Sequence, residues 1–245
     1  MLPETLKGKL LGLNDDMETR SALAVIETAR AEIPGLAMVS SFGAESVVLL
    51  HLMAQVDRSI PVLFIDTEML FPETVEYQQT LAETLGLTDI RRIAPDVAEV
   101  AALDPNGDLH RTDPDACCDL RKTRTLERAL SDFDGWITGR KRHQTANRAN
   151  LPIFEEEEGA PRIKVNPLAN WERGAAGRCI LKHNLPRHPL VAQGFASIGC
   201  APCTSKVAEG EDPRAGRWRG FEKQECGIHI VNGRFVPMRA QGGSK

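Results

Sequence analysis

Five of the six cysteines fall in three short stretches whose spacing suggests sulfur chemistry. They are the adjacent pair Cys117 and Cys118, the CxxC pair Cys200 and Cys203, and the lone Cys226 in the stretch ECGIH. Two close thiol pairs from distant segments can converge on a four-thiolate metal site, and the lone thiol in a glycine-containing tail is then the natural reactive group. The sequence therefore predicts a metal site and a separate nucleophile.

Other roles compete for the paired cysteines. The adjacent pair can be buried as small apolar side chains, and the CxxC pair can be a thioredoxin-like redox pair or half of a structural zinc site. The redox role is disfavoured, because such a pair should open a helix in a βαβ unit, whereas this one follows the end of the strand and helix alternation. Adjacent cysteines hold a tetrahedral ion awkwardly, while a four-iron cluster takes them on two irons. Zinc stays an alternative, and Cys179, with no partner nearby in the sequence, is expected to be a packing residue.

The composition is that of an ordinary globular protein. The chain has 245 residues, of which 42% are hydrophobic and 26% charged, enough to bury the core of one domain. No apolar run approaches the roughly 18 to 20 residues of a membrane span, and the N-terminal residues lack the order of a signal peptide, so we expect a cytoplasmic protein. Thiols stay reduced in that compartment, which favours metal or redox chemistry over disulfides. The net charge of -4 means that an anionic ligand needs a local basic cluster.

Apolar runs alternate with helical patterns along the first 140 residues. Strands are predicted at 36–41, 61–67, 89–93 and 135–139, and helices at 15–32, 45–56, 72–86, 96–103 and 117–133, with a polar loop at 104–115. This alternation predicts an α/β fold with a doubly wound, mainly parallel sheet, whose ligand crevice lies beyond the carboxyl ends of the strands.

The alternation ends near Asn150. Residues 151–168 are predicted to be irregular or a hairpin, and the cysteine-bearing part that follows to be an irregular C-terminal segment. We expect one domain over residues 1–235, with a mobile segment at about 204–235 and a disordered tail at 236–245.

Polar residues at the strand ends form the candidate ligand site. The turn at 40–46 joins a strand to a helix start, where free backbone N–H groups attract an anion, although its single glycine also fits plain tight packing. Asp66 and Thr67 can hydrogen-bond a nucleotide or cap the next element. The loop at 140–148 carries four basic side chains and no acid, which favours an anion site over a solvated loop.

Two further basic stretches flank the cysteines. Lys122 lies four residues after Cys118 on one helix face, where it can offset the charge of a thiolate cluster, bind the substrate anion, or simply be exposed. A basic, glycine-containing stretch at 214–220 precedes Cys226 and can act as a mobile lid. Nearby arginines or His229 would lower the pKa of the Cys226 thiol, and Glu225 would raise it.

Together these motifs resemble the assimilatory adenylyl-sulfate reductases of the phosphoadenylyl-sulfate reductase family. The resemblance runs from about Val39 to His229 and lies in the CC, CxxC and ECGIH motifs, the turn at 40–45 and the stretch TGRKRHQ. It implies an adenine-nucleotide α-hydrolase-like fold, a [4Fe-4S] cluster on the two cysteine pairs, and Cys226 as nucleophile. It also implies substrate contacts at Ser40, Ser41, Gly43, Ala44, Glu45, Asp66, Thr67, Lys122, Arg140, Arg142, Gln144, Arg148, Arg214, Arg217 and His229.

The resemblance further implies a reaction. The expected activity is thioredoxin-dependent reduction of adenylyl sulfate to sulfite and AMP through an S-sulfocysteine on Cys226, in sulfate assimilation toward cysteine. A glutaredoxin-like protein is an alternative reductant, and a homo-oligomer is an open expectation. The rival substrate is 3′-phosphoadenylyl sulfate. A second rival, a metal-stabilised RNA-associated module without catalysis, is disfavoured by 5% aromatic residues and an acidic net charge.

The chain departs from the family pattern in one segment. After Trp171 the family usually has an acidic and aromatic helix, whereas this chain has Glu-Arg-Gly-Ala-Ala-Gly-Arg-Cys at 172–179. Gly174 and Gly177 are expected to weaken a helix there by roughly 1 kcal/mol each relative to alanine.

Overall fold

A six-stranded, mostly parallel sheet forms the centre of the computed structural model, which describes residues 4–221 and 223. The strand order is β3-β2-β1-β4-β6-β5, and only the edge strand β5 is antiparallel to its neighbour. The strands are β1 (Leu36–Ser40), β2 (Val62–Ile65), β3 (Ile90–Ile93), β4 (Gly135–Ile137), β5 (Phe154–Glu156) and β6 (Ile163–Val165). This is the doubly wound architecture that the sequence predicts.

Alternate residues of the central strands face two separate apolar cores. In β1, Met38 belongs to the larger core and Ala37 to the smaller one; in β4, Ile137 and Trp136 divide in the same way. This period of two is the side-chain alternation of a strand, and burial on both faces explains why the central strands are nearly all apolar. The edge strand β3 carries exposed arginines at its two middle positions.

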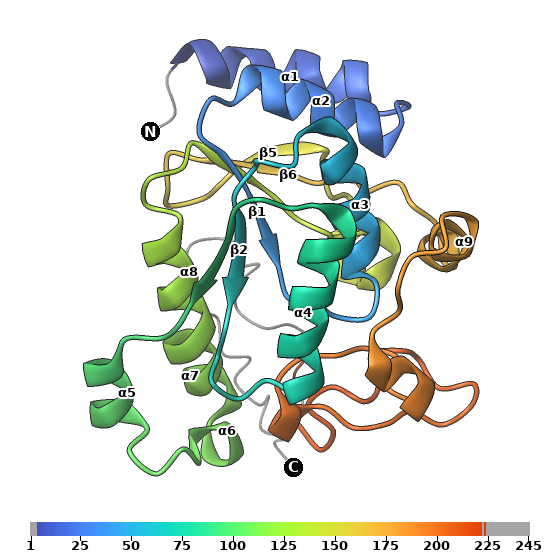
Figure 1. The fold of residues 1–245 in the computed structure, drawn as a ribbon. Helices are drawn as coiled ribbons and strands as arrows, with labels where there is room; N and C mark the ends of the chain where they lie inside the picture. The colour runs from blue at the N-terminus through green and yellow to red at the C-terminus, as the bar shows by residue number, and fades with distance from the viewer. Residues whose placement is uncertain (1–3, 222, 224–245) are drawn as a thin grey trace, which may run out of the picture.

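Helices cover both faces of the sheet (Figure 1). On one face lie α2 (Ala22–Glu32), α3 (Ser46–Val56), α4 (Pro72–Leu85) and α9 (Ala175–Lys182), with α1 (Glu4–Met17) packed near β5. The other face is covered by α8 (Arg124–Ala129), and the chain reaches it through α5 (Val97–Leu103), α6 (Leu109–Thr112) and α7 (Pro114–Cys118). Among the described residues, no helix has the length and apolarity to cross a membrane.

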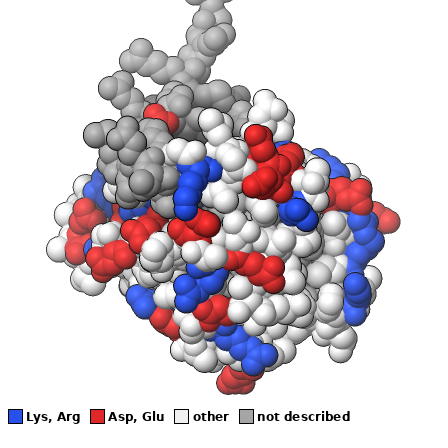
Figure 2. Space-filling view, turned by 90° about the horizontal axis from the view of Figure 1, so that it is seen from above, with Lys and Arg blue, Asp and Glu red and all other residues white. Residues whose placement is uncertain are grey.

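Lys, Arg, Asp and Glu side chains are interspersed on the face that carries α1 and α2 (Figure 2). Several of these charges are paired there, such as Lys9 with Glu32 at 2.9 Å and Arg30 with Asp57 at 2.8 Å. The described part of this face therefore presents mixed charge rather than a continuous basic surface.

Two predicted helices differ from the structure. The single helix expected at 15–32 is two helices, because Ser21 ends the turn after α1 and its hydroxyl accepts a hydrogen bond from the Ala24 amide at 3.2 Å. The helix expected at 117–133 is α7, a π-helical turn at Asp119–Thr123 and α8. The loop expected at 104–115 contains α6 and the start of α7.

The segment after β4 follows the prediction in part. Residues 154–165 form the antiparallel hairpin of β5 and β6, and β6 also pairs in parallel with β4. The segment at 172–179 still forms a helix: Gly174 stands just before α9 with φ +79°, a conformation that suits glycine, so only Gly177 lies in the helix interior. The predicted weakening therefore applies to one glycine rather than two.

Candidate active site

The two cysteine pairs are held on either side of the segment that follows β2. Cys118 ends α7, and Arg121 in the following π-helical turn donates to the carbonyl of Thr67 at 3.1 Å. On the other side Cys200 forms an antiparallel bridge with Leu70, and its Sγ lies 3.2 Å from the hydroxyl of Thr67. One short segment, residues 67–70, thus positions both cysteine pairs.

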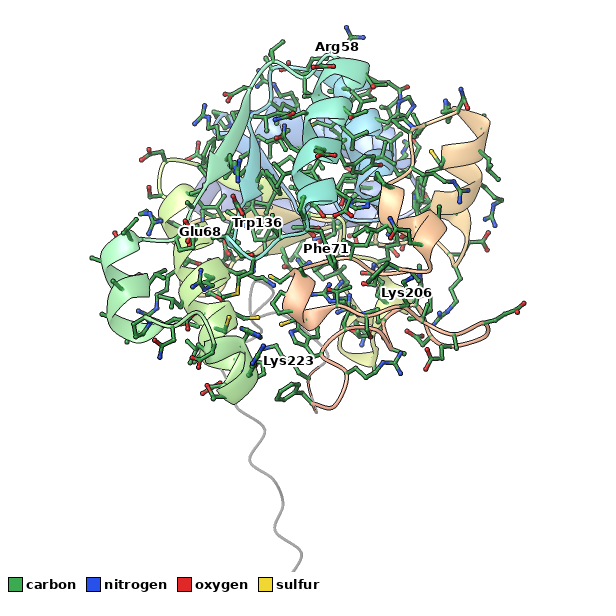
Figure 3. The ribbon with its side chains drawn as sticks, turned by 60° about the horizontal axis from the view of Figure 1, so that its bottom comes forward. Arg58, Glu68, Phe71, Trp136, Lys206 and Lys223 are labelled. Atoms are coloured by element: carbon green, nitrogen blue, oxygen red, sulfur yellow. The ribbon has the colours of Figure 1, made fainter. Side chains whose placement is uncertain are left out.

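The four thiols interact electrostatically with one another. Burial raises the pKa of Cys117 to about 12, and Cys118, Cys200 and Cys203 add to that rise. Burial and the Cys200 thiol also raise the pKa of Cys203, while cations at Lys122, Arg217 and Lys223 act in the opposite direction. All four are free thiols in the structure. The convergence predicted for the two distant pairs is therefore present; in Figure 3, yellow sulfur atoms lie between α7 and the C-terminal loops.

The four thiols are soft donors of the type that holds zinc or iron–sulfur clusters. No three His, Cys, Asp or Glu side chains within residues 4–221 and 223 are arranged to hold one metal ion. A four-iron cluster needs a wider arrangement, since each thiolate binds a different iron. Burial and neighbouring thiols raise the pKa of Cys117 and Cys203, and bound iron ions, which stabilise the thiolate form, would act against that rise.

A pocket of about 360 Å³ opens at the carboxyl ends of β1, β2 and β4, next to the cysteines. This is the crevice position expected for a doubly wound sheet. Cys200 is part of its wall. Of the predicted substrate contacts, the lining includes Ser40, Ser41, Gly43, Ala44, Glu45, Thr67, Lys122, Arg140, Gln144, Arg148, Arg214 and Arg217.

The turn between β1 and α3 is tightly closed. Gly43 donates from its amide to the Ser46 hydroxyl at 2.9 Å, and Phe42 adopts φ +47° with its ring fully buried. A Cβ on Gly43 would come within 3.2 Å of the carbonyl oxygen of Ile198, so glycine lets the loop at 197–199 lie close to the turn. The turn therefore forms one wall of the pocket together with the loop that carries Cys200.

Comparisons with known proteins agree with this geometry. Residues 35–206 match the family model described as the phosphoadenosine phosphosulfate reductase domain. The chain belongs to this family. The match confirms the resemblance found in the sequence, and with it the prediction of an oxidoreductase that acts on a sulfonucleotide.

Curated relatives extend over most of the chain. An adenosine 5′-phosphosulfate reductase of Chelativorans sp. (strain BNC1) is 50% identical over 196 residues, which cover 80% of this chain and 79% of the relative. The enzyme of the same name from Streptomyces coelicolor is 35% identical over 231 residues, covering 92% of this chain and 95% of the relative. These relatives therefore span nearly the whole domain.

Solved structures confirm the predicted adenine-nucleotide fold. The phosphoadenylyl-sulfate reductase of Candida auris, in a phosphate complex, has a TM-score of 0.69 and 26% identity, and the match covers 84% of this chain and 98% of that one. The FMN adenylyltransferase of Candida glabrata, with a TM-score of 0.55 and 14% identity over 85% of this chain and 76% of that one, shares the fold alone.

Not every basic residue predicted from the family resemblance faces the pocket as an unpaired charge. Arg140 donates through Nε to Thr138 Oγ1 at 3.2 Å and Asn166 Oδ1 at 3.1 Å, and it pairs with Glu155. Three acceptors thus hold its guanidinium at the pocket wall, where it fixes the β5–β6 hairpin. Arg148 donates to Gln144 within the same loop.

Two predicted contacts lie outside the pocket lining. Arg142 pairs with Glu18 at 2.6 Å and donates to the Leu151 carbonyl at 2.8 Å, so it ties the loop after β4 to the turn that follows α1. Asp66 is buried and accepts from Arg92 Nε at 2.6 Å, and its neighbour Thr67 is the residue that reaches the pocket. Cys226 and His229 lie outside the described residues.

The structure also places Lys141 and Trp218, which were not among the predicted substrate contacts, in the pocket wall. Lys141, buried in the pocket wall, pairs with Glu45 at 2.9 Å. The Arg217 guanidinium lies 4.5 Å from the Trp218 ring centroid, and both side chains line the pocket. Arg217 Nε and Trp218 Nε1 are buried with no hydrogen-bond partner in the described part of the chain, so they are donors available to a ligand. A tryptophan in a basic, glycine-containing stretch is too common a signal to have indicated the place of Trp218 in the pocket wall.

Proposed function

We propose that the protein reduces adenylyl sulfate to sulfite and AMP with electrons from a dithiol protein. The observation that carries this proposal is a cation-lined pocket at the strand ends whose wall contains Cys200, one of four interacting thiols. The family membership and the names of the curated relatives support the substrate class.

In this proposal adenosine lies against the ends of β1, β2 and β4, and the sulfate end points toward the cysteines. Lys122, Arg214 and Arg217 line the pocket and supply positive charge, and Lys122 and Arg217 also act to lower the pKa of the nearby Cys203 thiol. Guanidinium groups match the oxygen geometry of phosphate and sulfate. Charge neutralisation there lowers the barrier for the departure of a phosphate leaving group.

Cys117, Cys118, Cys200 and Cys203 would hold a [4Fe-4S] cluster. When bound, the cluster would charge and shape the wall of the sulfate subsite. Lys122 suits this place because its ammonium group acts on the Cys203 thiol and also lines the pocket. The same cation can therefore face the cluster and the substrate.

We assign the nucleophile to Cys226. Its thiolate attacks the sulfur of adenylyl sulfate, a bond forms between the two sulfur atoms, and AMP leaves with the electron pair of the broken sulfur–oxygen bond. The protein then carries S-sulfocysteine. His229, three residues further, is assigned to the same site.

The second half of the reaction needs a thioredoxin or a glutaredoxin-like protein. A thiolate of that partner attacks Cys226 Sγ, sulfite leaves with the electron pair of the sulfur–sulfur bond, and a mixed disulfide forms. The partner's second thiol resolves it, which returns Cys226 as a thiolate and leaves the partner oxidised. Such a cycle needs reduced dithiols, so we place the protein in the cytoplasm.

An anaerobic assay tests the proposal. Sulfite is measured from adenylyl sulfate and from 3′-phosphoadenylyl sulfate, with and without thioredoxin. We expect a higher kcat/KM for adenylyl sulfate and dependence on thioredoxin. The reverse order of kcat/KM would assign the protein to the rival substrate, and full sulfite release by Cys226→Ser would overturn the mechanism. Stoichiometric zinc without iron or acid-labile sulfide would refute the cluster.

A further inference from the structure

A histidine in the loop after β4 lies in the pocket wall and has no part in the reaction steps given above. His143 belongs to the 3₁₀ turn Arg142–Gln144, and its half-buried side chain lines the pocket together with Gln144. This turn follows the carboxyl end of β4, where a doubly wound sheet binds its ligand. His143 is therefore placed to contact a nucleotide in the pocket.

The segment that follows β6 fixes the His143 ring. Nδ1 of the ring lies 2.7 Å from the carbonyl oxygen of Trp171, and the Arg142 amide donates to the Ala169 carbonyl in the same segment at 3.0 Å. A carbonyl oxygen only accepts hydrogen bonds, so Nδ1 carries the proton and donates it. In the neutral ring the free lone pair is then on Nε2, which makes that atom a hydrogen-bond acceptor.

The side chains next to His143 are engaged with one another. Lys141 pairs with Glu45 at 2.9 Å, and Oε1 of Gln144 accepts from the Lys141 amide at 3.1 Å and from Arg148. Within residues 4–221 and 223, the His143 ring is hydrogen-bonded through Nδ1 alone, and Nε2 has no partner. This part of the pocket wall therefore offers an acceptor that a ligand can use.

We propose that Nε2 of His143 accepts a hydrogen bond from the nucleoside part of the substrate and selects adenosine through that donor. Adenosine offers its exocyclic amine and its ribose hydroxyls. A site built to hydrogen-bond such a group discriminates against an analogue that lacks it, because the protein acceptor is then left unpaired. The cations Lys122, Arg214 and Arg217 suit the anionic end of the substrate instead. The inference rests on the proposed function, because the nucleotide must occupy this pocket.

Binding of AMP to the full-length protein tests the role of Nε2, at about pH 8, where imidazole side chains are ordinarily uncharged. Two variants separate the ring nitrogens. The amide of His143→Asn replaces Nδ1 and can still donate to Trp171, but it does not reach the position of Nε2. The amide of His143→Gln reaches the position of Nε2 instead. We expect about tenfold weaker AMP binding in His143→Asn and nearly wild-type binding in His143→Gln. The reverse order would give His143 a purely structural role and overturn the proposal.

Nucleotide analogues identify the donor that His143 recognises. Inosine monophosphate lacks the exocyclic amine, and 2′-deoxy-AMP and 3′-deoxy-AMP each lack one ribose hydroxyl. The analogue without the recognised donor should bind wild type and His143→Asn with equal affinity, because the variant then loses no hydrogen bond. A tenfold difference that persists with every analogue would overturn the proposal, since none of these donors would then face Nε2.

His110→Asn is the matched control. His110 lies in α6, outside the pocket lining, and its Nδ1 is also close to a backbone carbonyl, that of Gly107 at 3.1 Å. This variant should bind AMP like wild type. Equal weakening in His110→Asn and His143→Asn would show a general effect of the exchange and overturn the proposal. Lack of AMP binding and of sulfite release in wild type would instead refute the proposed function.

Discussion

The guanidinium of Arg121 lies 2.9 Å from the carboxylate of Asp104, and both side chains are almost fully buried, with 6% and 0% exposed. Arg121 also donates to the Thr67 carbonyl. Burial alone would raise the pKa of Asp104, yet the Leu109 amide and the Arg121 guanidinium together hold that pKa below its ordinary value. This ion pair fixes the π-helical turn after Cys118 against the segment that contacts Cys200.

Loss of Arg121 should destabilise the fold near the cysteines. In Arg121→Met the Asp104 carboxylate stays buried without its partner, which typically costs about 3 to 5 kcal/mol of unfolding free energy. The double variant Arg121→Met/Asp104→Asn should recover part of this loss. Urea unfolding at matched metal content measures the unfolding free energy of both variants. A decrease below about 1 kcal/mol in the single variant would show that the ion pair contributes little to stability.

Cys203 and Cys179 should differ in their effect on iron content. Cys203 interacts with Cys200 and with Cys117, whereas Cys179 packs partly buried against the main core, where burial raises its pKa. Cys203→Ser should lose bound iron and acid-labile sulfide, and Cys179→Ser should keep both at the wild-type ratio. Equal iron content in the two variants would remove Cys203 from the proposed ligand set.

Gly199 should control the position of Arg217 in the pocket. A Cβ at residue 199 would collide with the Arg217 guanidinium, which is the far end of a flexible side chain and can move aside. Gly199→Ala should therefore keep its melting temperature within a few degrees and raise KM for adenylyl sulfate by about tenfold, through loss of a charge-assisted contact. A lower melting temperature with unchanged KM would contradict this role.

His188 should make stability depend on pH in the mildly acidic range. The imidazole is buried, its Nδ1 accepts from the Leu190 amide at 3.2 Å, and Nε2 lies 3.0 Å from the hydroxyl of Thr74. Burial lowers its pKa to about 4, with an opposing effect from Glu73. The unfolded chain binds a proton near pH 6.5, so stability is full above that pH and falls between pH 6.5 and 4, by up to about 3 kcal/mol.

Denaturant unfolding at pH 7.5, 5.5 and 4.5 checks this dependence. His188→Gln removes the titrating group and should show a smaller loss of stability between pH 7.5 and 4.5 than wild type. The change of unfolding free energy with pH is compared between the two proteins because other groups also titrate in this range. Parallel curves for the two proteins would show that His188 does not determine the acid sensitivity.

Local signals in the sequence predicted most of the fold. Apolar runs such as that around Val62 predicted the central strands, since a parallel strand buried on both faces must be apolar. Pro72 and Gly86 predicted the ends of α4, where Gly86 adopts φ +65°. The break at Ser21 was missed because apolar spacing continues through it, and a single capping serine is a weaker signal than periodicity.

The sequence by itself determined the chemistry available to the protein: two thiol pairs, a lone thiol, a small-residue turn and a set of basic residues. The tertiary structure decided which of them meet. It brought α7 and Cys200 to the same segment after β2, turned Arg142 away from the pocket and placed Trp218 in its wall. Residue types and their spacing indicate the local structure that a segment prefers. Which functional residues come together depends on how distant elements pack, and contacts such as those of Asp104 and Thr67 with Arg121 determine that packing.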